Sequence, residues 1–102
     1  MSQVTVRVRI PASLRGATAG RPTVEARLGA GGNPAPDVRA LLDQLATVHP
    51  DLERRVRDEQ GSLRRHVNLF VGPTNIRDLD EQATTLCDGD EVAILPAVSG
   101  GA

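Results

Sequence analysis

The sequence predicts an α+β domain in which a mixed sheet carries helices on one face. Three observations favour this class: alternating apolar residues near the N-terminus, one apolar stripe at helical spacing, and further apolar segments toward the C-terminus. The length of 102 residues is that of one domain. We therefore assign residues 1–96 to the domain and residues 97–102 to a tail.

The N-terminal part predicts two strands that pair as a hairpin. Apolar and polar residues alternate over residues 4–10, a period of two that is typical of a strand with one buried face. Glycine and proline in residues 14–23 are typical of a turn, and the alternation returns over residues 24–28. A second strand therefore follows the first and pairs back on it.

The middle of the chain predicts one main helix and a short second one. Asp37 can cap the first helix, because its carboxylate can accept hydrogen bonds from exposed backbone N–H groups. Pro50 ends this helix and opens the short helix. A helix this short is marginal alone in water, so its apolar stripe must pack on the sheet. The stripe comprises Val38, Leu41, Leu42, Leu45 and Val48.

The C-terminal part predicts the remaining strands. Residues 66–71 and 91–96 are apolar segments of strand length, and a short edge strand is expected around Ile76. The order is strand, strand, helix, short helix, strand, short strand, strand. This is the order of the ubiquitin-like β-grasp, in which the last strand runs at the centre of the sheet beside the first.

Composition excludes several classes of function. The formal net charge is −1, so no global attraction to nucleic acid or to a membrane is implied. Phe70 is the only aromatic residue, which argues against a platform for stacking bases. No segment has the length of a membrane span, and the N-terminus lacks the apolar stretch of a signal peptide. We expect a cytoplasmic protein with no nucleic-acid or membrane partner.

The body of the domain shows no catalytic or metal-binding motif. His49 and His66 lie far apart, and neither has a ligand neighbour at metal-binding spacing. Cys87 is the only cysteine, so no internal disulfide is possible, and we expect it to be a small buried residue. We therefore expect a protein that is not an enzyme and binds no metal or cofactor of its own.

One surface of the predicted sheet favours docking of a partner. If the alternating neighbours of Phe70 and Leu95 face the helices, these two side chains face away from them. Arg7 and Arg9 of the first strand lie on the same outer face. An exposed apolar patch with an arginine rim is typical of a docking surface. Val98 of the tail is assigned to the same surface.

The tail predicts a flexible segment with a reactive end. Ordering six residues costs on the order of 6–12 kcal/mol of backbone entropy, and no cluster of large apolar residues offsets it. Gly100 and Gly101 lack Cβ atoms, so they can thread a narrow channel of another protein. A carboxylate at this end needs activation, typically as an acyl-adenylate formed with ATP, before sulfur can replace one oxygen and give a thiocarboxylate.

The sequence resembles the bacterial sulfur carriers of the MoaD/ThiS family, which includes the small subunit of molybdopterin synthase and the thiamine-pathway carrier. The matching segments are "VTVRVRIPASLR", "VRALLDQLATVHPDL", "HVNLFV" and "DGDEVAILPAVSGG". They cover nearly the whole domain. Within the family, "IPASLR", "HVNLFV" and "ILPAVSGG" are most similar to the cysteine-biosynthesis branch.

The resemblance implies a function and a set of partners. The reactive terminal glycine of the family corresponds to Gly101, with Gly100 beside it. An adenylating enzyme of the ubiquitin-E1-like class would activate Gly101 with ATP. A PLP-dependent cysteine synthase would accept the sulfur, and a zinc-dependent JAMM-type peptidase would release cysteine. ATP, PLP and zinc belong to these partners and not to this chain.

Ala102 departs from the family pattern, because it blocks the Gly101 carboxylate. We expect a peptidase to remove it before activation. Three alternatives remain open: a thiocarboxylate donor for molybdopterin, thiamine or secondary-metabolite pathways, a ubiquitin-like modifier of lysines on other proteins, and a β-grasp interaction module that needs no free Gly101. The chain itself has no lysine, since its twelve basic residues are all arginine.

Overall fold

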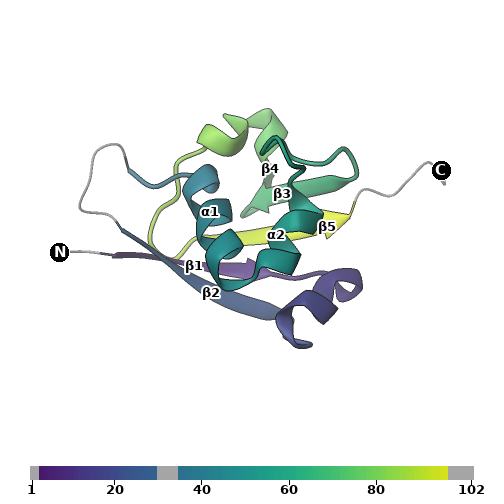
Figure 1. Cartoon of the computed structure of the whole chain (residues 1–102). Helices are drawn as coiled ribbons and strands as arrows, with labels where there is room; N and C mark the ends of the chain where they lie inside the picture. The colour runs from purple at the N-terminus through teal and green to yellow at the C-terminus, as the bar shows by residue number, and fades with distance from the viewer. Residues whose placement is uncertain (1–2, 30–34, 97–102) are drawn as a thin grey trace.

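The computed structural model describes residues 3–29 and 35–96, which form a five-stranded mixed sheet with helices on one face (Figure 1). The strands run in the order β2-β1-β5-β3-β4. The predicted α+β class and the central place of the last strand beside the first are therefore confirmed.

The N-terminal hairpin consists of β1 (Gln3–Arg9) and β2 (Thr23–Gly29), which pair antiparallel. Their connection contains a 3-10 segment, η1 (Ala12–Thr18), where the sequence predicts only a turn. The buried Thr18 hydroxyl donates to the carbonyl oxygen of Arg21 at 2.9 Å. This bond ties the end of η1 to the start of β2, which the glycine and proline pattern does not reveal.

Helix α1 (Val38–Val48) and helix α2 (Pro50–Val56) have the predicted places. The Ala40 N–H donates to Asp37 Oδ1 at 2.9 Å, so the predicted cap is confirmed. Val48 does not belong to the buried stripe, because 56% of it is exposed. It is the last residue of α1, and beyond it Leu52 and Val56 of α2 complete the helical side of the core.

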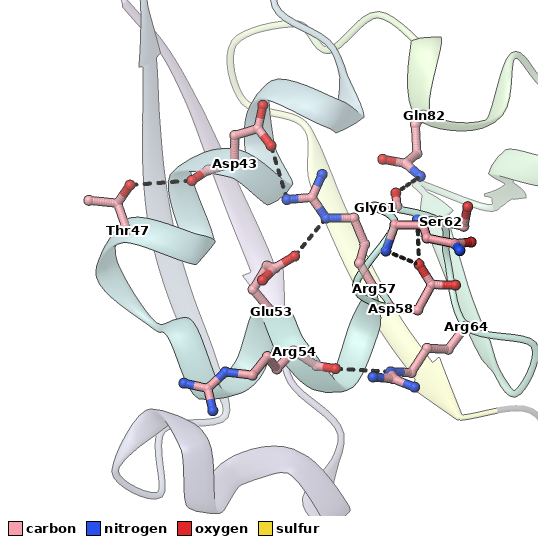
Figure 2. A network of polar contacts seen from close by, with 11 residues as sticks. Asp43, Thr47, Glu53, Arg54, Arg57, Asp58, Gly61, Ser62, Arg64 and Gln82 are labelled. Atoms are coloured by element: carbon pink, nitrogen blue, oxygen red, sulfur yellow. Dashed lines mark hydrogen bonds and ion pairs between the residues drawn. The ribbon is translucent and has the colours of Figure 1, made fainter.

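Arg57 joins the two helices, as Figure 2 shows. Its Nε donates to Glu53 Oε2 at 2.8 Å and its Nη2 donates to Asp43 Oδ1 at 2.9 Å. Only 9% of the Arg57 side chain is exposed, so this charge needs both carboxylates. These two hydrogen bonds hold the C-terminal end of α2 against α1.

The rest of the sheet is built from β3 (Val67–Val71), β4 (Thr74–Asn75) and β5 (Glu91–Pro96). β5 pairs parallel with β1 and antiparallel with β3. The edge strand expected around Ile76 lies just before it, at β4. Ile76 is itself fully buried and begins the 3-10 segment η2 (Ile76–Asp78), which is followed by η3 (Glu81–Ala83).

The core lies between the inner face of the sheet and the two helices. Every second residue of β1 and β2 is buried there, from Val4 to Val8 and from Val24 to Leu28. The expectation that Cys87 is buried is wrong, because it is exposed. Its N–H donates to Asp90 Oδ2 at 2.9 Å and its carbonyl accepts from the Asp90 N–H, so it opens a surface turn.

Two features of the described residues bear on function. Within residues 3–29 and 35–96, no helix has both the length and the apolar character needed to cross a bilayer. The same residues contain no group of three or more His, Cys, Asp or Glu side chains placed to hold a metal ion.

Candidate functional site

The outer face of the sheet brings the predicted docking residues onto three neighbouring strands. Phe70 of β3 lies opposite Ala93 of β5, and Ala93 lies opposite Arg9 of β1. Leu95 follows two residues after Ala93 on the same face, and 43% of it is exposed. Phe70 is half-buried. The prediction that both apolar side chains face away from the helices agrees with this register.

A groove of about 460 Å³ joins these residues. Phe70, Ala93 and Leu95 supply apolar surface, and Arg9 with Arg15 supplies positive charge at its border. Pro11 and Pro22, at the two ends of the hairpin connection, also line the groove. The full lining comprises Arg9, Ile10, Pro11, Arg15, Pro22, Thr23, Phe70, Gly72, Glu91, Ala93, Ile94 and Leu95.

Arg7 does not line this groove. It borders a neighbouring hollow of about 430 Å³ with Glu25, Asp88 and Glu91. Arg7 also lies opposite Glu25 on β2 and opposite Glu91 on β5, so acidic residues flank it on both sides. Of the two predicted arginines, only Arg9 belongs to the rim of the apolar groove.

The charge of Arg9 is only partly compensated. Its Nη1 lies 3.7 Å from Glu91 Oε1, and the two side chains are 64% and 47% exposed. An ion pair this exposed contributes little to stability. The guanidinium therefore remains available to a carboxylate on a partner surface.

Arg15 is a groove residue that sequence reasoning missed. Its Nε donates to the carbonyl oxygen of Ile10 at 3.0 Å, which holds the side chain beside the end of β1. Residues 14–23 read as a turn in the sequence, and no local pattern places Arg15 next to Phe70 and Leu95. Only the tertiary arrangement of η1 reveals it.

The groove lies next to the end of the last strand. Leu95 lines it, and β5 ends one residue later at Pro96. Val98, Gly100, Gly101 and Ala102 lie outside the described residues, so their predicted roles stay predictions. A protein that binds this groove is therefore adjacent to the point from which residues 97–102 continue.

Comparison with known proteins relates this chain to a family. The model of the ThiS family matches residues 8–101, which includes both glycines and ends one residue before Ala102. The chain belongs to the ThiS family. The resemblance predicted from the sequence is therefore confirmed.

Similar proteins agree with this assignment. The sulfur carrier protein CysO of Mycobacterium tuberculosis is 35% identical over 100 residues, which are 96% of this chain and all of that protein. Its crystal structure matches with a TM-score of 0.75, covering 91% of this chain and 99% of that one, at 35% identity. At this level of description, the chain is a sulfur carrier protein of the CysO, ThiS and MoaD type.

Two other structures extend the comparison. The crystal structure of the BexX/CysO complex of Amycolatopsis orientalis matches with a TM-score of 0.76 at 32% identity, covering 94% of this chain and 99% of that one. The small archaeal modifier protein 1 of Haloferax volcanii matches with a TM-score of 0.77 at 27% identity, covering 93% and 99%. The predicted ubiquitin-like β-grasp is thus confirmed, and a relative of this type forms a complex with another protein.

Proposed function

We propose that this chain, after removal of Ala102, carries sulfur as a thiocarboxylate on Gly101 and donates it. Cysteine biosynthesis is the pathway that we favour for this sulfur. The observation that carries the proposal is the family match that runs through the domain to Gly101. Similarity to CysO over nearly the full length favours the cysteine branch.

The groove on the outer face supports docking of the activating enzyme. It offers apolar surface from Phe70 and Leu95, with Arg9 and Arg15 at its border. Such a surface would hold the domain while residues 97–101 reach an active site in the partner. Five extended residues span roughly 17 Å, enough to enter a channel.

The chemistry proceeds at the terminal carboxylate. An adenylating enzyme of the E1-like class joins the Gly101 carboxylate to the AMP part of ATP, and pyrophosphate leaves. Sulfide sulfur then attacks the acyl carbon, the C–O bond to AMP breaks, and AMP leaves with the bonding electrons. The product is a thiocarboxylate, which is nucleophilic at neutral pH.

The partners of the cysteine branch complete the proposal. On a PLP-dependent synthase, the thiocarboxylate sulfur would displace the activating group of serine, which leaves the new cysteine joined to the Gly101 acyl group. A zinc-dependent JAMM-type peptidase would then hydrolyse this link, which releases cysteine and restores the Gly101 carboxylate. In this scheme ATP, PLP and zinc act within the partner enzymes. The carrier contributes its docking surface and its terminal carboxylate.

Ala102 must leave first, because its peptide bond occupies the Gly101 carboxyl group. The test incubates the full chain with the peptidase, ATP, the activating enzyme and sulfide, and records the intact mass. We expect loss of one alanine residue, followed by exchange of one oxygen for sulfur. A trimmed chain that never gains sulfur with an activating enzyme proven on its own carrier would contradict the proposal.

Similarity to a small archaeal modifier protein supports a second candidate, a ubiquitin-like modifier of other proteins. The same activated Gly101 would then form an isopeptide bond with a lysine of a target. Conjugates of higher mass in cells, absent for Gly101→Val, would favour this candidate. Sulfur transfer to molybdopterin, thiamine or a secondary metabolite would instead use the same thiocarboxylate with a different acceptor.

A further inference from the structure

A second groove lies on the other side of the β5 terminus, between η1 and α2. One hollow of about 370 Å³ is bordered by Leu14, Val67, Ile94 and Pro96 together with Arg54, Arg55, Arg64 and His66. A second hollow of about 350 Å³ shares Ser13, Leu14, Arg54 and Arg55 with the first. Because they share these residues, the two hollows adjoin each other, and we call them together the basic groove.

The basic groove has an apolar floor. Val67 and Ile94 are core residues with 5% and 1% exposure, and Leu14 packs against the core while remaining partly exposed. Burying an apolar side chain on this floor would be favourable. An inorganic anion has no apolar surface that this floor could bury.

The rim of the basic groove carries excess positive charge. Asp51 is the only acidic residue among the residues that line it, and it pairs with Arg54 at 3.3 Å. Both side chains of that pair are 73% exposed, so the pair is weak. Within residues 3–29 and 35–96, the Arg55 side chain makes no ion pair and no hydrogen bond. A chain with a net charge of −1 thus concentrates positive charge at one place.

Arg64 is held in position before any partner binds. Its Nε donates to the carbonyl oxygen of Arg54 at 2.9 Å, as Figure 2 shows. Its N–H donates to the Val56 carbonyl at 2.9 Å, and its own carbonyl accepts from the Val67 N–H at 3.1 Å. A guanidinium fixed in this way loses little conformational freedom when it binds a carboxylate.

We propose that the basic groove binds an acidic peptide segment with an apolar side chain, supplied by the partner enzyme that takes the C-terminal residues. We choose this partner because of where the groove lies: Pro96, the last residue of β5, borders the basic groove. The groove combines arginines, which can bind carboxylates, with an apolar floor. The identity of the partner rests on the proposed function, whereas the binding chemistry does not.

The first experiment needs no partner enzyme. The isotopically labelled full chain is titrated with the acetylated and amidated peptide Glu-Glu-Leu-Glu-Glu, and the amide signals are followed by NMR. We expect shifts at Leu14, Arg55 and Val67 but not at Phe70. Replacing every glutamate of the peptide by glutamine, or its leucine by serine, should weaken binding. Shifts confined to the outer face, equal binding of the glutamine peptide, or equal binding of inorganic phosphate would overturn the proposal.

A charge-matched pair of variants sharpens the test. Arg55→Glu and Arg39→Glu reverse one exposed charge each, on α2 and on α1. We expect Arg55→Glu to weaken peptide binding about fivefold or more, while Arg39→Glu leaves it nearly unchanged. Equal effects of the two substitutions would mean that peptide binding depends only on the net charge of the chain, and would overturn the proposal.

A second experiment tests the choice of partner. With a chain ending at Gly101, Arg55→Glu should lower kcat/KM for loading about fivefold relative to Arg39→Glu, with the difference shrinking at high salt. Equal values would overturn the assignment to the loading enzyme. If the parent chain is never loaded, the proposed function fails, and the peptide titration still decides the binding chemistry of the groove.

Discussion

Residues of the inner face and residues of the outer face alternate along each strand of the sheet, and a substitution has different consequences on the two faces. Leu69 is fully buried against the helices, while its neighbour Phe70 is half-buried on the outer face. Val8 is fully buried, while 64% of the adjacent Arg9 side chain is exposed. A substitution on the inner face should therefore change mainly the stability of the domain, whereas one on the outer face should change mainly the proposed docking.

The largest effect should come from the inner face. Leu69→Ala should lower the free energy of unfolding by about 2–5 kcal/mol, because it removes buried surface and leaves a cavity. The matched control is Phe70→Ala, one residue along the same strand, which should cost clearly less. Urea denaturation measures both, and equal losses would show that Phe70 is as important to the core as Leu69.

The next effect should come from the contact between the helices. Arg57→Met should cost about 2 kcal/mol, because it leaves Glu53, whose side chain is 17% exposed, without its partner. Arg54→Met removes a pair that is 73% exposed on both sides and should cost less than about 0.5 kcal/mol. Thermal unfolding of the two variants compares them directly, and an equal change would contradict the special role of Arg57.

Substitutions in the groove on the outer face should lower loading by the activating enzyme far more than they lower the stability of the domain. The double variant Phe70→Ser with Leu95→Ser should lower kcat/KM for loading by the activating enzyme about tenfold or more, since apolar anchors dominate docking. Its unfolding free energy should fall less than that of Leu69→Ala. Arg7→Ala is the control, because Arg7 lies on the same face but outside the groove. A double variant that loads like the parent would remove the docking role of this groove.

The smallest effect should come from the rim. Arg9→Gln removes the exposed pair with Glu91 and should change stability by less than about 0.5 kcal/mol. Loading should slow about two- to threefold at low salt, with the difference fading as salt rises. A defect that persists unchanged at high salt would show that Arg9 acts through packing.

Much of the fold could be predicted because the local patterns agree with it. Alternation identifies the buried residues of β1 and β2, and the cap at Asp37 follows from its carboxylate. Val48 and Cys87 are exposed for different reasons: Val48 is the last residue of α1, where helical spacing no longer decides burial, and Cys87 lies in the loop between η3 and β5, where residue type alone does not decide it. The 3-10 segment η1 depends on the hydrogen bonds of Thr18, which no pattern of apolar residues records.

The residues that line the groove on the outer face could be predicted in part, whereas its docking role stays a prediction. Phe70, Leu95 and Arg9 follow from strand alternation once the order of strands is known. Arg15 could not be found, because the place of η1 beside the sheet brings it to the groove, and no pattern in residues 14–23 indicates that place. The basic groove was missed for the same reason, since η1, α2 and β5 are distant in sequence and meet only in the folded domain.

The carboxylate of Gly101 is the proposed site of sulfur loading, and a comparison of two chains tests this role. Two chains, one ending at Gly101 and one retaining Ala102, are incubated with the activating enzyme, ATP and sulfide in the absence of any peptidase, and their intact masses are recorded. We predict that only the chain ending at Gly101 exchanges an oxygen for sulfur, and that Gly101→Val in that chain prevents the exchange. Sulfur gained by the chain that still retains Ala102 would contradict the role of a free Gly101 carboxylate.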